Sequence, residues 1–304
     1  MNTLTAVLAA VLAAGTLSTA VAAPAVPIDG TLDAAYGPAL STQAVQTPGD
    51  NSPLDIAHAT GSELDQGYAF VVDGVLHLFL AGNVRGYFNV EFYPQDNVQI
   101  FVDSRAGGQN VLRGDNSGVG FYANTLNLLA GLTFDAGFEP DYWFDCTVGP
   151  QDPPVFAYAA ELLGGGGGGG LFLGRTTAGG PGMLSGGTNP DGILATIDNL
   201  NTAGVALGCD GASGAGVSTG IEWAIPLSAI GNPTGCFRVC AFINIADPVD
   251  AQLLNQVLGP VPPGTCLLGV PSGVSLAGDQ FFTVCPGSTP ARPTTWGAMK
   301  TLYR

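Results

Sequence analysis

Basic residues are scarce in this sequence, which has 8 Lys and Arg against 24 Asp and Glu and a formal net charge of -16. An acidic surface of this kind repels the phosphate backbone of nucleic acids and the anionic headgroups of lipids. The charge therefore predicts no nucleic-acid partner, whereas neutral glycans and divalent cations remain compatible with it. An acidic surface that only keeps the protein in solution accounts for the charge equally well.

Recognisable catalytic motifs are also lacking. The two histidines, His58 and His77, are too few for a three-His zinc site, and no H-E-x-x-H motif occurs. Ser218 lies in a G-x-S-x-G pattern, but both histidines precede it and a strand is expected after it, where a hydrolase needs a helix. No spacing singles out a pair of acids for glycoside hydrolysis. We therefore expect a protein that is not an enzyme.

Long apolar runs are confined to the N-terminus. Residues 6–15 are apolar, and the small-x-small motif Ala-Val-Ala at 20–22 follows them. This pattern predicts a signal peptide over residues 1–22, with Ala23 as the mature N-terminus. The run is shorter than the roughly 20 residues that a membrane helix needs, and no Cys precedes Cys146 to accept a lipid. The sequence thus predicts a secreted or cell-surface protein with no membrane span.

An exported chain does not keep its thiols reduced, so the six cysteines are expected to form disulfides. They are Cys146, Cys209, Cys236, Cys240, Cys266 and Cys285. The segment between Cys236 and Cys240 alternates like a strand, which would place the two residues about 13 Å apart. We therefore expect no bond between Cys236 and Cys240, and the sequence leaves the connectivity open.

Apolar residues recur with period two along most of the mature chain, and sustained helical periodicity is nearly absent. The clearest element is a hairpin whose two alternating runs meet at Asp73-Gly74, a type I′ turn sequence. Further strands are expected around residues 98–102, 142–148, 221–225, 237–243 and 280–284. The fold class is therefore predicted to be all-β, an antiparallel β-sandwich.

Glycine and proline, 46 and 22 residues, lie mainly between the expected strands and predict long Gly-rich loops. The seven consecutive glycines at 164–170 predict a flexible excursion, because ordering them is entropically costly. One sandwich domain is expected over residues 23–285.

Residues 286–304 are expected to form a Pro-rich linker and a basic C-terminal tail. Arg292, Lys300 and Arg304 lie in this tail without an accompanying acid. The tail is a candidate sorting or anchoring signal that a receptor would recognise. A frayed terminus that happens to be basic is the alternative.

Three motifs in this chain, and the order in which they occur, resemble those of one protein family. They are an opening Ile-Asp-Gly-Thr-Leu-Asp within residues 27–36, the strand Gln-Asp-Asn-Val-Gln-Ile-Phe-Val-Asp at 95–103, and Ile-Glu-Trp-Ala-Ile-Pro-Leu at 221–227. They are similar to motifs of family 9 carbohydrate-binding modules (CBM9) and their DOMON-like relatives. The resemblance implies a β-sandwich, frequently with structural calcium, that binds a sugar by aromatic stacking and polar side chains.

The resemblance also implies positions for the site. Tyr93 falls where the family has a stacking Trp, Gln99 where it has a sugar-binding Glu, and Asn244 near a Gln that hydrogen-bonds the sugar. For calcium, the expected loops carry Asp103, Asp115 and Asp198, whose carboxylates are the hard oxygen ligands that this ion prefers.

These observations lead to two functional hypotheses. The first is an exported, non-catalytic carbohydrate-binding-like module whose partner is a glycan or cell-surface polysaccharide. The alternative is a cell-surface or extracellular-matrix structural protein that binds no free sugar and is attached through residues 286–304.

Overall fold

The computed structural model describes residues 26–43, 45, 62–85, 95–120, 124–149, 154–201, 209, 211, 215–246, 251–274 and 278–287. Four of the features discussed above lie outside the described residues: the signal peptide at 1–22, His58, Tyr93 and the tail from residue 288 onward. Every structural statement below concerns the described residues.

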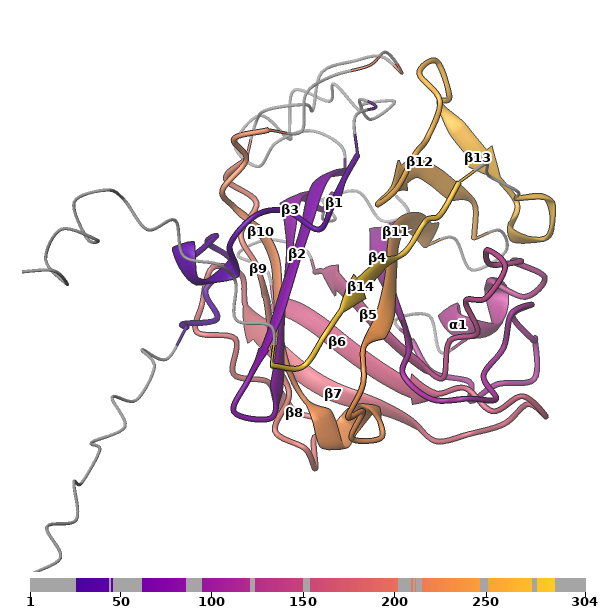
Figure 1. Cartoon of the computed structure of the whole chain (residues 1–304), viewed down its shortest axis with the longest axis horizontal. Coiled ribbons are helices and arrows are strands. Elements are labelled where there is room, and N and C mark those ends of the chain that lie inside the picture. The colour runs from indigo at the N-terminus through magenta and orange to yellow at the C-terminus, as the bar shows by residue number, and fades with distance from the viewer. Residues whose placement is uncertain are drawn as a thin grey trace, which may run out of the picture.

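Two antiparallel sheets make up the protein (Figure 1). The five-stranded sheet has the order β1 (Ser41–Thr42), β2 (Glu63–Val72), β3 (Val75–Asn83), β10 (Gly220–Pro226) and β9 (Leu194–Ile197). The nine-stranded sheet runs β13 (Leu267–Gly269), β12 (Leu253–Val257), β11 (Phe237–Ala246), β4 (Gln95–Asp103), β5 (Tyr142–Val148), β6 (Pro154–Glu161), β7 (Gly170–Thr177) and β8 (Ser185–Gly186), and β14 (Phe282–Val284) also pairs with β11. The predicted all-β fold class is confirmed.

The helices are short. They are η1 (Ala34–Tyr36), α1 (Thr125–Leu128), η2 (Leu227–Ile230) and η3 (Pro271–Gly273). In the described part of the chain, no helix has the length and apolar character needed to cross a bilayer.

The predicted hairpin is formed by β2 and β3, with Val72 paired to Val75 across the turn. Asp73 and Gly74 have φ values of 51° and 76°. A type I′ turn requires positive φ at both central residues, and Asp followed by Gly tolerates it. The turn signal of this hairpin therefore lies in the local sequence.

The main core lies between the two sheets. Alternate residues of the strands point inward, so Leu78 and Trp223 of the five-stranded sheet face Ile100, Phe144 and Val239 of the other. Trp223 and Phe144 meet edge to face with ring centroids 5.8 Å apart. Each such buried side chain stabilises the fold by about 1.5–3 kcal/mol. This layer holds the sandwich together.

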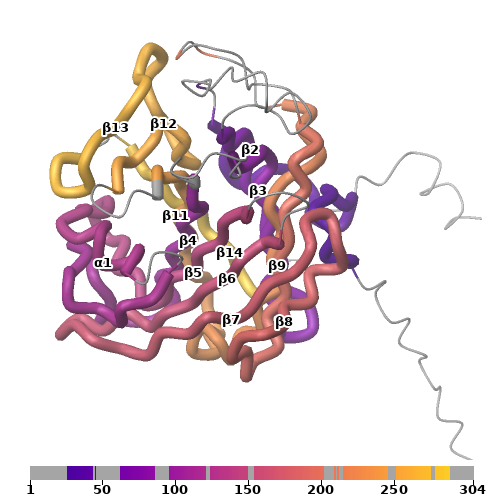
Figure 2. Tube along the Cα trace, turned by 180° about the vertical axis from the view of Figure 1, so that it is seen from behind, coloured from indigo at the N-terminus to yellow at the C-terminus, as the bar shows by residue number. Residues whose placement is uncertain are grey.

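The outer face of the nine-stranded sheet carries a second apolar cluster, which includes Phe101, Trp143 and Phe242. Residues 112–120 and 124–138, including α1, contribute Leu126, Leu129 and other side chains to the same cluster. Figure 2 shows α1 and its loops on the side of this sheet away from the five-stranded one. The outer face of the larger sheet is therefore an organised interior of its own.

The outer face of the five-stranded sheet is covered by an N-terminal segment, residues 26–39. Glu222 of β10 is fully buried and accepts hydrogen bonds from the backbone N–H groups of Asp29 and Gly30, at 2.9 and 2.8 Å, and from the Tyr36 hydroxyl, at 2.8 Å. Tyr36 also meets Phe70 edge to face. The first and third motifs of the family-like pattern thus contact each other directly.

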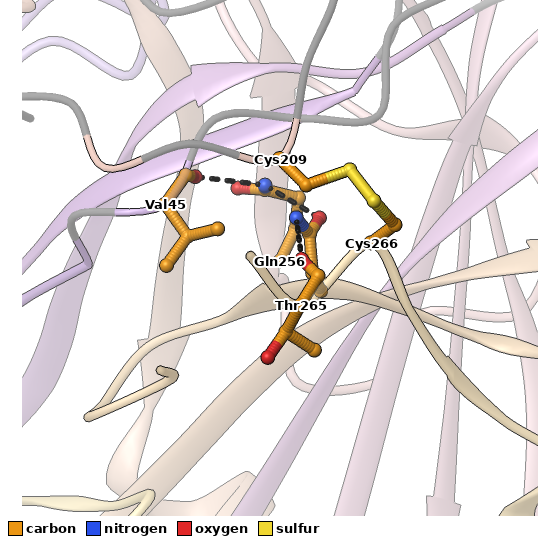
Figure 3. Close-up of a disulfide and its surroundings, with 6 residues drawn as sticks. Val45, Cys209, Gln256, Thr265 and Cys266 are labelled. Carbon is orange, nitrogen blue, oxygen red and sulfur yellow. Dashed lines mark hydrogen bonds between the residues drawn. A yellow bond between two sulfur atoms is a disulfide. The ribbon is translucent and has the colours of Figure 1, made fainter. Parts of the chain in front are cut away.

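At one side of the sandwich, a buried network of side-chain amides links the two sheets next to a disulfide (Figure 3). The Gln256 amide of β12 donates to the Val45 carbonyl oxygen at 3.1 Å and accepts from Gln43 at 2.6 Å. Asn255 donates to the Thr265 carbonyl oxygen at 2.7 Å, next to Cys266 in its disulfide with Cys209. Figure 3 shows Val45, Gln256 and Thr265 gathered beside the Cys209–Cys266 disulfide.

Four of the six cysteines form the disulfides Cys209–Cys266 and Cys236–Cys285, and no bond joins Cys236 to Cys240. Cys146 and Cys240 are free and buried, so the prediction that all six are bonded is wrong for these two. Cys146 faces the core between the sheets, whereas Cys240 belongs to the cluster on the outer face. The sheet itself separates their sulfur atoms.

The seven-glycine run does not form a free excursion. Gly164 and Gly167 donate to the backbone carbonyl oxygens of Gly107 and Asp115, and Gly170 begins β7. Gly166 has a φ of 85°, a conformation that residues with a Cβ rarely adopt, so glycine is favoured there.

Candidate functional site

A row of outward-facing side chains crosses five strands of the nine-stranded sheet. Phe242 of β11 lies opposite Gln99 of β4, Gln99 opposite Asp145 of β5, Asp145 opposite Tyr158 of β6, and Tyr158 opposite Phe172 of β7. Directly opposite residues of antiparallel strands bring their Cβ atoms within about 5.5 Å of each other. The row therefore places two polar side chains between aromatic rings on one face.

We name Gln99, Trp143, Asp145 and Asn244 the Gln99 cluster. The Gln99 amide donates to Asp145 Oδ1 at 3.0 Å and to Asn244 Oδ1 at 2.8 Å. Its Oε1 accepts from the Trp143 indole Nε1 at 2.5 Å. All four side chains are fully buried. Because both of its amide protons are used, Gln99 holds the orientation of its three neighbours.

Asp145 is the chemically unusual member of the Gln99 cluster. Burial raises the pKa of its carboxyl well above the usual range, and the hydrogen bond from Gln99 opposes this only in part. Asp145 Oδ2 is buried without a hydrogen-bond partner among the described residues. A neutral carboxyl group both donates and accepts, so this oxygen could serve either kind of ligand atom.

Asn97, on the same face of β4 as Gln99, has the same property. Its side chain is fully buried, and neither Oδ1 nor Nδ2 has a partner in the described part of the chain. A buried polar group without a partner costs about 1–3 kcal/mol. The outer face thus carries three polar atoms with unused hydrogen-bonding capacity.

Aromatic rings form the outer end of the row. Tyr158 and Phe172 have ring centroids 5.1 Å apart, and Phe156 lies 6.4 Å from Phe172. Tyr158 is 8% exposed, and Phe156 and Phe172 are half-buried. This is the part of the row that solvent reaches.

Two of the three predicted sugar-binding residues, Gln99 and Asn244, are in direct contact, while Tyr93 lies outside the described residues. Gln99 and Asn244 are buried beneath the surface. Sequence reasoning missed Asp145, although its signal was present: an acid at the centre of an otherwise apolar strand, 142–148. A buried ionisable residue at such a position is typical either of a structural hydrogen-bond or ion-pair network or of a functional site.

The three predicted calcium ligands do not gather. Asp103 pairs with Arg238 at 3.4 Å, Asp115 binds Arg113 through both carboxylate oxygens, and Asp198 accepts from the backbone N–H of Leu200 at 3.0 Å. Within the described ranges, no three His, Cys, Asp or Glu side chains lie close enough together to hold a metal ion.

The family-like motifs therefore coincide with parts of the structure that contact one another, and the polar residues that they point to meet on one face of the larger sheet. The sequence matches no model of a known protein family, and comparison with curated proteins and with solved structures finds no significant similarity.

Proposed function

We propose that the protein binds a neutral glycan on the outer face of the nine-stranded sheet and does not turn it over. One observation carries the proposal: Asp145 Oδ2 and the two polar atoms of Asn97 lack hydrogen-bond partners in the described part of the chain and lie on the same face as the rings of Tyr158 and Phe172. A sugar offers both complements, since its hydroxyl groups donate and accept and its C–H faces stack on rings.

The half-buried Phe172 ring is the first contact in this proposal. Its partner Tyr158 lies directly opposite Asp145 across the β5–β6 pair. Because the Gln99 cluster is buried, the glycan reaches Asp145 only when the packing around the cluster opens, and the half-buried Phe172 ring holds the glycan until then. Binding should therefore be slower than for an open cleft.

Charge and compartment are consistent with this function. A net charge of -16 selects against anionic polysaccharides and leaves neutral ones unaffected. The disulfides Cys209–Cys266 and Cys236–Cys285 are compatible with an exported protein. A surface or matrix structural protein without free-sugar binding is the competing function.

The test starts with the mature protein on an array of neutral glycans, followed by calorimetry with the best glycan. Phe172→Ala and Asp145→Asn should each weaken binding at least tenfold, about 1.4 kcal/mol, while the protein stays folded. Tyr142→Ala is the matched control, because this half-buried ring lies under Arg105, away from the row. It should leave the affinity unchanged.

Three results would contradict the proposal. Wild-type protein that binds no glycan on the array would favour the structural protein. Release of reducing sugar from the bound glycan would reveal a hydrolase. Equal loss of affinity in all three variants would show that the row is not the binding surface.

A further inference from the structure

A pocket of about 260 Å³ opens on the outer face of the nine-stranded sheet, over β11 and β12. Its floor is made by Cys240 and Phe242 of β11 and by Leu253 and Val257 of β12. Two segments far apart in the sequence, 132–138 and 280–281, form its walls. The pocket is distinct from the Gln99 cluster, although Phe242 lies opposite Gln99 across the β4–β11 pair.

The walls of the pocket are aromatic. Phe138 stacks on Phe281 with ring centroids 5.4 Å apart and planes only 10° from parallel. Phe134 meets Phe138 edge to face at 5.4 Å, and Phe242 on the floor stacks on Phe101 at 5.7 Å. A flat ligand that entered this space would continue an existing arrangement of rings, in which offset-stacked and edge-to-face contacts are both favourable.

Three sets of contacts hold the walls in place. Asp135 Oδ2 accepts a hydrogen bond from the backbone N–H of Gln280 at 2.6 Å, which joins the two walls. The Arg238 guanidinium lies 5.3 Å from the centre of the Phe281 ring and donates to the Gly137 carbonyl oxygen. Beyond residue 281, β14 pairs with β11 and is fixed by the disulfide of Cys285. The pocket is therefore preformed, which lowers the cost of binding.

The polar groups at the rim restrict the ligand further. Asp135 is half-buried and presents a carboxyl group, and the Gln280 side chain donates to the Pro260 carbonyl oxygen. A carboxylate at the rim, in a protein of net charge -16, disfavours anions and favours a ligand that can donate a hydrogen bond. Apolar walls with a few placed polar groups are typical of small-molecule sites.

We propose that this pocket binds a small, uncharged, planar aromatic molecule of one or two fused rings that carries an N–H or O–H donor. A dry apolar cavity of about 150 Å³ is large enough for benzene, so 260 Å³ accommodates one further ring. The donor of the ligand points to Asp135, and its rings lie between Phe281 and the β11 floor. This site shares Phe242 with the row of the glycan site but none of the residues that the glycan proposal rests on.

Cys240 provides a reporter for occupancy. Its side chain is 4% exposed, and burial raises the pKa of the thiol, so it stays neutral at physiological pH. As a neutral thiol it presents a soft, polarisable surface to the ligand instead of attacking it. Cys146 is also free but fully buried in the core between the sheets, and it serves as the matched control.

The binding experiment uses the mature protein with both disulfides intact and calorimetric titration with indole, and separately with 2-naphthol. Both probes should bind with one site per chain. Cys240→Met, which fills the floor, and Phe281→Ala, which removes one wall, should each weaken binding at least tenfold. Cys146→Ala should leave the affinity of both probes unchanged.

A labelling experiment reads out the same site without a variant. N-Ethylmaleimide reacts with the thiolate, so labelling of these two buried, neutral thiols is slow; Cys240 should still be modified at least fivefold faster than the fully buried Cys146, and saturating indole should slow Cys240 alone. Absence of probe binding to wild-type protein would overturn the proposal. Equal labelling rates for the two thiols, or tight probe binding to both Cys240→Met and Phe281→Ala, would overturn it as well. Loss of glycan binding leaves these readouts unaffected, so the two proposals fail separately.

Discussion

Glu222 offers the most direct test of how the N-terminal segment is held. Replacing it with Ala leaves the Tyr36 hydroxyl and the backbone N–H groups of Asp29 and Gly30 without their shared acceptor. Two of these three hydrogen bonds are buried, and each buried donor left unpaired costs about 1–3 kcal/mol. We expect Glu222→Ala to lower the free energy of unfolding by about 4 kcal/mol at pH 5.

The size of this effect should depend on pH. Burial raises the pKa of Glu222 to about 7 from its ordinary value of 4.5, and the hydrogen bonds from Gly30, Tyr36 and Asp29 oppose the rise without cancelling it. A pKa that is higher in the folded state means that the group stabilises the fold below pH 4.5 and loses this contribution as the pH rises through 7. The cost of Glu222→Ala should therefore shrink by about 3 kcal/mol between pH 5 and pH 8.

Urea denaturation at the two pH values measures both quantities. Glu161→Ala is the control, because this carboxylate lies on a strand but forms an exposed ion pair with Arg105, worth less than about 1 kcal/mol. A Glu222→Ala variant that is destabilised no more than the control at pH 5 would show that the N-terminal segment does not depend on this residue. A cost that grows from pH 5 to pH 8 would refute the assigned direction of the pKa shift.

Three further predictions concern the sheets. At pH 8, Asp145→Asn should unfold at the same temperature as the wild type or higher. The raised pKa of the Asp145 carboxyl means that its contribution to stability is lost as the pH rises, whereas the amide oxygen of Asn still accepts the hydrogen bond from Gln99. Thermal melts at pH 5 and pH 8 check this. Removing the Cys236–Cys285 disulfide by double substitution to Ala should cost about 4 kcal/mol in a urea titration, since it closes a loop with a sequence separation of 49. By the same titration, Gly82→Ala should lower the free energy of unfolding by about 3 kcal/mol or more, because the new Cβ would collide with a backbone carbonyl oxygen of β2. Gly74→Ala should lower it by about 1 kcal/mol, because Gly74 has a φ of 76° but open space around it.

Elements with strong local signals could be predicted from the sequence. The β2–β3 hairpin followed from alternation and its Asp-Gly turn, and β5 was placed at residues 142–148. By contrast, β6 and β7 were missed. Their sequences, Pro-Val-Phe-Ala-Tyr-Ala-Ala-Glu and Gly-Leu-Phe-Leu-Gly-Arg-Thr-Thr, are rich in Ala and Gly, which have low strand propensity. These strands form because neighbouring strands offer hydrogen bonds and apolar surface, which is a tertiary effect.

The candidate site was predictable only in part for a related reason. Gln99 and Asn244 were reached through the resemblance of their strands to a family pattern, but the role of Asp145 depends on the register of β4 with β5. The register of β4 with β5 depends on long-range packing, so no local motif predicts which residue lies opposite Gln99. Strand geometry excludes a bond between Cys236 and Cys240, but the choice of Cys285 as partner depends on the pairing of β14 with β11.

The two outer faces of the sandwich differ in what covers each of them. On the five-stranded sheet, Tyr36 and its neighbours cover the Phe70 and Phe79 rings, and Glu222 has partners for both carboxylate oxygens. On β2 and β3 of that sheet, Asp65 Oδ2 and His77 Nδ1 are also buried without a hydrogen-bond partner among the described residues, but the rings beside them are covered. The nine-stranded sheet has a preformed pocket and the buried Oδ2 of Asp145, which lacks a hydrogen-bond partner among the described residues. Such features lower the stability of the fold, which is not expected of a face with a purely structural role. Binding is therefore expected on the larger sheet, and both proposals place it there.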